Sequence, residues 1–268
     1  MWVGQQLADG LDFWGFLGSL ILGGIILGIY TGLLGYVGAK TGLSLDLLSQ
    51  RAFGEKGSYL PSAMTSFTQI GWFGVGSFVS GGTATPNFAR FAKNGKAGAI
   101  TTVVAFFIGN SLMFFFGAVS SIFVGGNDIF EVMVRLNLFY LAVLVLGLNI
   151  WTTNDNALYT AGLGLANIFH QRKKPMVLLS GIIGTVASVW LYYNFCGWLN
   201  ILNCTLPPVG MILVLAYFMN KEDFETDQPK LKTVDWFAVA GVILGAIVAN
   251  LLHLSLIHIS EPTRPEPI

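Results

Sequence analysis

The sequence predicts an all-α polytopic membrane protein, and its composition is the first reason. Only 10% of the 268 residues are charged and 54% are hydrophobic, whereas a soluble domain carries about 25% charged residues. Glycine is abundant, with 33 residues, which suits helices that pack closely in lipid. Lys plus Arg equals Asp plus Glu, at 14 each, so the net charge points to no nucleic-acid partner. A soluble enzyme, a disulfide scaffold and a disordered protein are excluded.

Long charge-free runs are the second reason. A helix that crosses a bilayer needs about 20 apolar residues, and helices are expected because they satisfy their own backbone hydrogen bonds in lipid. The runs are 13–39, 57–89, 97–127, 136–154 with its continuation 156–171, 175–220 and 236–252. The run 175–220 is long enough for two spans. Tyr192, Tyr193, Asn194 and Gly197 mark the expected turn, because aromatic residues favour the membrane interface.

Basic residues predict which ends of the spans face the cytoplasm, because Lys and Arg collect in cytoplasmic loops. Four clusters stand out, namely Lys40 with Arg51 and Lys56, Arg90 with Lys93 and Lys96, Arg172 with Lys173 and Lys174, and Lys221 with Lys230 and Lys232. From Arg90 onward, alternating spans place every cluster inside. The run 57–89 breaks the pattern, because it joins two inner clusters but is too short for two spans. Either it is a re-entrant hairpin, or sequence is missing between Trp72 and Phe78.

Polar residues inside a membrane are costly and usually face a cavity or a partner helix. The densest group surrounds Asn149, which shares a helical face with Thr152 and Asn156 and adjoins Thr153. Their hydroxyl and amide oxygens are hard ligands that suit a cation such as Na⁺. Alternatively, they bond the backbone or a neighbouring helix. Asp155 is a candidate proton relay or, equally, a structural hydrogen-bond partner.

Two further polar groups precede this one in the chain. Gln69 and Trp72 are three residues apart, so one helix face pairs an amide with a broad stacking surface. The amide offers a donor and an acceptor, which match the edge of a nucleobase or of an amide. A Trp on an apolar helix also commonly faces lipid or the core. The segment 77–83 combines Ser and Thr with Gly81 and Gly82, as in a helix that unwinds at membrane depth and exposes its backbone to a substrate. Plain helix packing would use the same small residues.

Gly24, Gly28 and Gly32 recur every four residues and predict only a seam at which another helix packs closely. The sequence contains no nucleophile–base pair, metal motif, phosphate loop or dinucleotide fingerprint. We therefore predict that the protein is not an enzyme and carries no cofactor.

Five segments of the chain carry a family resemblance. They are GIYTGLLGYVGAKTG at 28–42, QIGWFG at 69–74, NFARF at 87–91, GNSLMF at 109–114 and GLNIWTTNDNALY at 147–159. Together they resemble the bacterial nucleobase:cation symporter family, and the last segment is the most specific. The resemblance implies a partial inverted-repeat, LeuT-like transporter fold, in which about seven hydrophobic helical segments of twelve remain.

The resemblance also implies how the chain is organised. Residues 1–252 form a partial transporter membrane domain, with a deletion junction near 75–76 that joins the third span of the family to its sixth. Residues 253–268 are expected to be a non-native or disordered tail, because they are rich in proline and look like a translated sequencing adapter. We expect such a fragment to be inactive in transport.

Substrate contacts follow from the same resemblance, residue by residue. Trp72 and Phe78 match an aromatic pair that sandwiches the base. Gln69 and Asn149 match side chains that hydrogen-bond it. Ser77 lies in the match to the unwound helix, whose backbone also reads the base.

Thr152 and Thr153 match sodium ligands. The implied activity is sodium-coupled uptake of cytosine or a related nucleobase by alternating access across the bacterial inner membrane. The expected partners are the nucleobase, Na⁺ as coupling ion and the lipid bilayer. Two alternatives stay open: a proton-coupled permease for another nucleobase or a hydantoin, with Asp155 as relay, and a membrane subunit that transports nothing.

Overall fold

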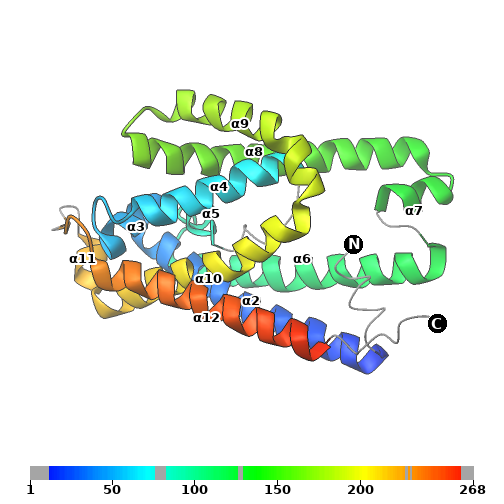
Figure 1. The fold of residues 1–268 in the computed structure, drawn as a ribbon, viewed down its shortest axis with the longest axis horizontal. Coiled ribbons are helices and arrows are strands. Elements are labelled where there is room, and N and C mark those ends of the chain that lie inside the picture. Colours follow the sequence, from blue (N-terminus) through cyan, green and yellow to red (C-terminus); the bar gives the residue numbers. More distant parts are fainter. Residues whose placement is uncertain (1–11, 76–82, 126–128, 227–228, 230, 261–268) are drawn as a thin grey trace.

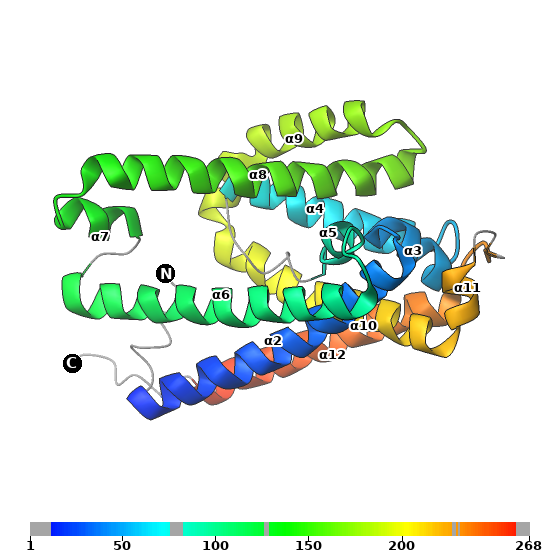
Figure 2. The same cartoon turned by 180° about the vertical axis from the view of Figure 1, so that it is seen from behind.

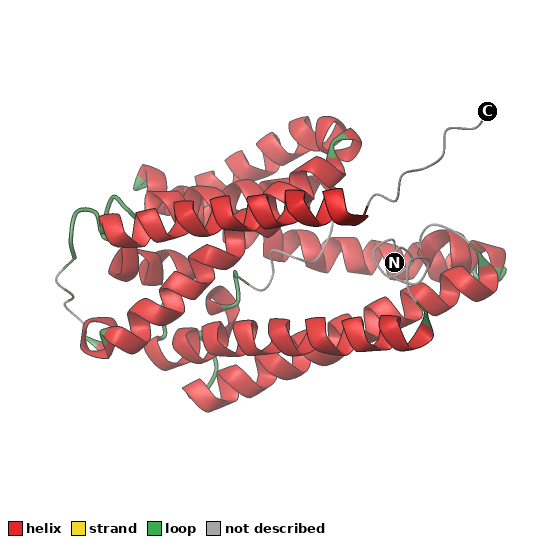
Figure 3. Ribbon diagram, turned by 60° about the horizontal axis from the view of Figure 1, so that its bottom comes forward, coloured by secondary structure: helices red, strands yellow, loops and turns green. Residues whose placement is uncertain are grey.

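The computed structural model describes residues 12–75, 83–125, 129–226, 229 and 231–260, and every regular element in these ranges is an α-helix (Figure 3). Seven helices have 17 residues or more: α2 (Phe13–Thr41), α4 (Tyr59–Val75), α6 (Gly95–Val124), α8 (Phe139–Phe169), α9 (Lys173–Tyr193), α10 (Phe195–Met219) and α12 (Trp236–Ser260). Four short helices lie between them: α3 (Leu45–Phe53), α5 (Pro86–Ala89), α7 (Ile129–Arg135) and α11 (Lys221–Glu225). The predicted all-α class with about seven long segments is confirmed.

Capping residues decide where α2 begins and ends. The Asp12 carboxylate accepts a hydrogen bond from the Gly15 N–H at 3.1 Å, which satisfies one free donor of the first turn. Gly42 ends the helix with φ 69°, a left-handed conformation that costs glycine nothing, and its N–H bonds the Gly38 carbonyl. The chain can then turn at once into α3, which Ser44 caps.

Three described helices are long and apolar enough to cross a membrane: Phe13–Thr41, Gly95–Val124 and Lys173–Leu191. Two further apolar stretches, Cys204–Met219 and Trp236–Leu252, are shorter than these three. The predicted turn in the run 175–220 is confirmed, because α9 ends at Tyr193 and α10 begins at Phe195.

The last helix extends further than predicted. We expected the apolar span to end at Leu252, but α12 continues through Ser260. Residues 253–260 include neither Pro nor Gly, and the first helix breaker after the span is Pro262. The local sequence therefore allows the helix to continue beyond Leu252, where the apolar stretch ends. The expectation that residues 253–268 are a non-native or disordered tail stays a prediction.

The long helices form two groups (Figures 1 and 2). Helices α4, α8 and α9 pack against one another on one side, and α2 packs along α6 on the other. Helix α10 runs from the first group to the second, where it packs on α12 and α2. Pro207 and Pro208 lie inside α10, and proline removes a backbone hydrogen bond and bends a helix.

Glycines allow α2 and α6 to approach closely. A Cβ added at Gly24 would lie 3.0 Å from the Phe107 ring, and one at Gly35 would lie 2.9 Å from the Gly98 carbonyl oxygen. The predicted seam of Gly24, Gly28 and Gly32 is confirmed, since all three are buried and face α6 side chains. Small residues let backbones meet where lipid supplies no hydrophobic driving force.

Candidate functional site

The polar stretch predicted to hold an ion lies in the middle of α8. Asn149, Thr152 and Asp155 are exposed and Thr153 is partly buried. The Thr152 hydroxyl donates to the backbone carbonyls of Leu148 and Asn149, each at 3.1 Å. The Thr153 hydroxyl donates to Asn149 Oδ1 at 3.1 Å. The structure therefore brings Asn149 and Thr153 together.

These oxygens fit a hard cation by their chemistry. Each hydroxyl gives its proton to its own helix and keeps oxygen lone pairs for a ligand. Neutral oxygen donors suit alkali and alkaline-earth ions. Among the described residues no group of three His, Cys, Asp or Glu could hold a metal ion. The candidate ion ligands predicted from the sequence are Thr and Asn oxygens.

Asp155 is bonded within its own helix. Its carboxylate accepts a hydrogen bond from the Trp151 indole N–H at 3.1 Å, one turn earlier in α8. The sequence left two roles open for Asp155, and this contact corresponds to the role of a structural hydrogen-bond partner. The relay role stays a prediction.

The predicted substrate residues lie on α4 and directly after it. Gln69 is buried, with 7% of its surface exposed. Trp72 lies within α4, but its side chain is outside the described part of the molecule. Ser77 and Phe78 also fall outside the described residues, so their predicted contacts with a base stay predictions.

Helices α4 and α8 run antiparallel, which relates the two groups of predicted residues. The Ser66 hydroxyl donates to the Ala161 carbonyl at 3.1 Å, and the Asn167 amide donates to Ser62 Oγ at 2.9 Å. Continued along both helices, this register places residue 72 at about the level of Asp155, because the helices rise equally per residue. The backbone thus presents Trp72 and Asp155 at about the same level, whereas Asn149 lies six residues earlier in α8.

Trp198 on α10 was not singled out from the sequence, yet it borders this region. It is buried and packs against Gly71, where an added Cβ would overlap the indole ring. Gly71 directly precedes Trp72. A tryptophan in an apolar run gives no sequence signal for such a position, because the same residue also packs in cores and at interfaces.

A polar network between α3, α4 and α8 was also missed by sequence reasoning. The Ser62 hydroxyl donates to Asp46 Oδ1 at 2.6 Å. Asn167 donates to Ser62 and to Ser58 Oγ at 3.1 Å, and it accepts from Gln50 Nε2 at 2.6 Å. Buried polar groups of this kind are held by complete hydrogen bonding. The network joins residues more than 100 positions apart at the end of the bundle opposite to Asn149.

Asp46 carries the charge of this network and is 5% exposed. Burial raises the pKa of its carboxyl from 3.8 to about 6, and the Ser62 hydrogen bond and the charge of Arg90 oppose that rise. Arg90 also donates to the Tyr159 hydroxyl on α8, and Lys173 lies 3.8 Å from the centre of the Tyr159 ring. Arg90 therefore connects the segment after α5 to α8.

Thr83, in the segment that precedes α5, is hydrogen-bonded to α2. The Tyr30 hydroxyl and Thr83 Oγ1 lie 2.8 Å apart, and Thr83 is buried. Asn87 Oδ1 accepts the Leu45 N–H at 2.8 Å, which satisfies a donor at the start of α3. Residues 83–90 thus contact α2, α3 and α8, and they position the end of the segment that was predicted to unwind.

The fold defines the class: an all-α polytopic membrane protein, with three described helices long and apolar enough to cross a membrane and a polar group in the middle of α8. A sequence model described as "permease for cytosine/purines, uracil, thiamine, allantoin" matches residues 1–84 and 74–259. The chain therefore belongs to this family of permeases, and the predicted family is confirmed.

Relatives agree with this assignment. The chain is 36% identical to the cytosine permease of Escherichia coli (strain K12), over 94% of this chain and 82% of the relative. The same values hold for the cytosine permease of Escherichia coli O157:H7. The allantoin permease of Bacillus subtilis (strain 168) is 34% identical over 31% of this chain and 16% of the relative. These relatives are transporters, so the chain belongs with transporters and not with enzymes.

Proposed function

We propose that the chain derives from a sodium-coupled importer of cytosine or a related nucleobase that works by alternating access in the bacterial inner membrane. The observation that carries the proposal is the match to cytosine permeases along 94% of the chain. The polar residues in the middle of the long helix α8 support it, because polar residues within a membrane span mark substrate and ion pathways.

The base is held by stacking and by hydrogen bonds in this proposal. Trp72 and Phe78 stack on its two faces, which is worth roughly 1–3 kcal/mol per stacked base. Gln69, which is buried, and Asn149 bond its edge, and the backbone beside Ser77 adds further contacts. A site of this kind rejects analogues that lack the bonding groups, because its own buried polar atoms would be left unpaired.

Sodium binds at Thr152 and Thr153 in this proposal. An ion that binds one conformation more tightly than another shifts the equilibrium between them, and transport is coupled through that difference. The separate packing of α4, α8 and α9 on one side and α2 with α6 on the other supports rocking of one group against the other.

We also propose that a segment is missing at about Val75–Gly76. The family model matches in two stretches that meet at residues 74–84. The alignment with the Escherichia coli relative spans 343 residues, whereas 94% of 268 residues is about 252, so about 90 positions of the relative have no counterpart here. About 90 residues suffice for two spans of about 20 with their connections and the remainder of the joined helices.

Uptake of radiolabelled cytosine tests both proposals. Cells would produce this chain, or this chain with the corresponding Escherichia coli segment inserted between Val75 and Gly76, and would be compared with a vector control. We expect uptake only from the completed chain, increased by an inward sodium gradient. Cytosine uptake by the unmodified chain would refute the proposal that a segment is missing. Absence of cytosine uptake by a completed chain that reaches the membrane would refute the substrate.

A matched pair of variants tests the ion site in the completed chain. Thr152 and Thr185 are both exposed threonines whose hydroxyls bond carbonyls of their own helices. We expect Thr152→Val to abolish the sodium dependence of uptake and Thr185→Val to preserve it. If the two variants showed the same sodium dependence of uptake, the proposed role of Thr152 as a sodium ligand would be refuted. Uptake driven by a proton gradient and lost in Asp155→Asn would instead favour the proton-coupled alternative.

A further inference from the structure

Residues 83–90 lie directly after the segment 77–82, which contains the predicted base contacts Ser77 and Phe78. The short helix α5 within them lies between α8 and the group of α2 and α6 (Figure 2). Phe78 precedes Thr83 by five residues, so the two lie within about 18 Å of each other, the reach of a fully extended chain of that length. The contacts that hold residues 83–90 therefore limit where the base contacts can lie.

Tyr159 is the point at which residues 83–90 meet α8. The Tyr159 hydroxyl accepts a hydrogen bond from Arg90. Its ring centre lies 6.2 Å from that of Phe88, and the Lys173 ammonium lies 3.8 Å from the same ring centre. Tyr159 follows Thr153 by six residues, which is about 9 Å along a helix. The residue that binds Arg90 therefore moves with the helix that carries the predicted sodium ligands.

Residues 83–90 are also held at α3. Asn87 Oδ1 accepts the Leu45 N–H at 2.8 Å, and the charge of Arg90 acts on the carboxyl of Asp46, the next residue of that helix. Asp46 is buried, and attraction between opposite charges is stronger where water is excluded. Arg90 is thus hydrogen-bonded to α8 and attracted towards α3.

These contacts join the two groups of helices that the proposed transport moves against each other. Helix α8 packs with α4 and α9, whereas α2 packs along α6. Thr83 lies 2.8 Å from the Tyr30 hydroxyl of α2, and Arg90 bonds Tyr159 of α8. One short segment is therefore bonded to both groups, so a relative movement of the groups acts directly on it.

We propose that Arg90 is a positioning residue that links sodium binding to base binding through Tyr159. This inference rests on the proposed sodium-coupled transport. Sodium at Thr152 and Thr153 fixes α8, Tyr159 then holds Arg90, and residues 83–90 hold the segment that contacts the base. The base binds more tightly to a segment that is already placed, because less conformational entropy is lost on binding. By linkage, the base in turn strengthens sodium binding.

A purely structural role for Arg90 makes a different prediction. Loss of a structural hydrogen bond lowers the amount of folded protein, and with it the maximal rate of uptake, but leaves the effect of sodium on cytosine affinity unchanged. The sodium factor, defined as the ratio of the apparent KM for cytosine at low sodium to that at high sodium, separates the two roles.

Uptake of radiolabelled cytosine by the completed chain measures the sodium factor. We expect a factor of roughly 5–150, the usual range for coupling between two sites. In Tyr159→Phe and in Arg90→Gln the factor should fall towards one, because a hydrogen bond to a charged group contributes about a factor of ten or more. Arg90→Lys keeps the charge and a donor, so it should retain more of the factor than Arg90→Gln.

Tyr59→Phe is the matched control. The Tyr59 hydroxyl lies 2.9 Å from Nε2 of His170, so it links α4 to the end of α8 and not to residues 83–90. This variant should keep the sodium factor of the unsubstituted completed chain. An unchanged factor in Tyr159→Phe, or equal falls in Tyr159→Phe and Tyr59→Phe, would overturn the inference and leave the proposed function standing. No uptake by the completed chain would refute the proposed function, and this inference with it.

Amide hydrogen exchange of the unmodified chain in detergent tests the link without transport. We expect Tyr159→Phe to speed exchange in residues 83–90 roughly tenfold, because the segment loses its bond to α8. Tyr59→Phe should leave exchange in residues 83–90 unchanged. Equal exchange rates of this segment in Tyr159→Phe and in the unsubstituted chain would show that Tyr159 does not hold it, and would overturn the inference.

Discussion

Replacing Ser62 by alanine removes the hydroxyl that holds the buried carboxylate of Asp46. The hydroxyl donates to Asp46 Oδ1 at 2.6 Å and accepts from the Asn167 amide at 2.9 Å, so the change leaves one acceptor and one donor without this partner. An unsatisfied buried polar group costs about 1–3 kcal/mol, and more when it is charged. We expect Ser62→Ala to lower the free energy of unfolding by roughly 2–4 kcal/mol at pH 8.

The stability lost in Ser62→Ala should depend on pH, and the pKa of Asp46 decides whether the loss grows or shrinks as the pH rises. Burial raises this pKa from 3.8 to about 6, so the folded state binds more protons than the unfolded state between these values. Stability of the unsubstituted chain therefore falls as pH rises through this window and is level above it. The Ser62 hydrogen bond lowers the pKa, so its removal raises the pKa further. The loss should thus be smaller at pH 5, where the carboxyl is protonated.

Thermal unfolding in detergent, followed by intrinsic fluorescence at pH 5 and pH 8, measures the effect. Asp46→Asn is the companion variant, because it keeps an acceptor but removes the charge and its titration. In the Asp46→Asn background, Ser62→Ala should lower the free energy of unfolding by the same amount at pH 5 and at pH 8. The reasoning would be refuted if Ser62→Ala, in the otherwise unsubstituted chain, lost as much free energy of unfolding at pH 5 as at pH 8. It would also be refuted if the losses caused by Ser62→Ala and Asp46→Asn were additive.

Two further predictions concern the contacts of α8. Gly164→Ala should destabilise the chain by roughly 1–3 kcal/mol, because the added Cβ would lie 2.8 Å from the Ser62 carbonyl oxygen and would push α4 from α8. Gly147→Ala, with nothing within 4 Å of the added Cβ, should be neutral or slightly stabilising, and a similar fall in the unfolding midpoint for both would contradict this explanation. Tyr159→Phe removes the hydroxyl that accepts from Arg90 and should cost about 1.5–3 kcal/mol; an unfolding midpoint that does not change would show that the bond contributes nothing.

The all-α class, the long apolar helices and the turn between α9 and α10 could be predicted from the sequence because their causes are local. A charge-free run of sufficient length must form a helix in lipid, where its backbone has no other partner. The turn at Asn194 and the glycine seam of α2 follow from the residues at those positions. The helix that begins at Trp236 continues beyond the apolar stretch that ends at Leu252, since the composition changes there but no residue breaks the helix before Pro262.

The candidate site could be predicted only in part. Local spacing showed that Asn149 and Thr153 adjoin, because both lie on one helix, and the structure has them hydrogen-bonded. Spacing could not show which helix faces Gln69 or that Trp198 packs beside Gly71. Helical periodicity identifies a face of a helix but carries no information about its partner.

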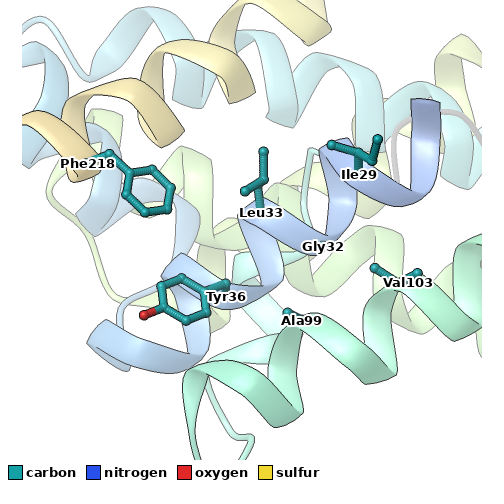
Figure 4. A pocket seen from close by; sticks show the side chains of 7 residues that line it. All are labelled: Ile29, Gly32, Leu33, Tyr36, Ala99, Val103 and Phe218. Carbon is teal, nitrogen blue, oxygen red and sulfur yellow. The ribbon is translucent and has the colours of Figure 1, made fainter. Parts of the chain in front are cut away.

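Two features were decided by the tertiary structure alone. Asp46 reads as an ordinary loop acid in the sequence, and it becomes a buried titrating group only when α4 and α8 bring Ser62 and Asn167 to it. The apolar groove lined by Ile29, Val103 and Phe218 (Figure 4) likewise requires α2, α6 and α10 to meet. Hydropathy is a local property of the sequence and can be read from neighbouring residues. Burial and charge complementarity depend on residues that are far apart in the chain and become neighbours only when the helices pack.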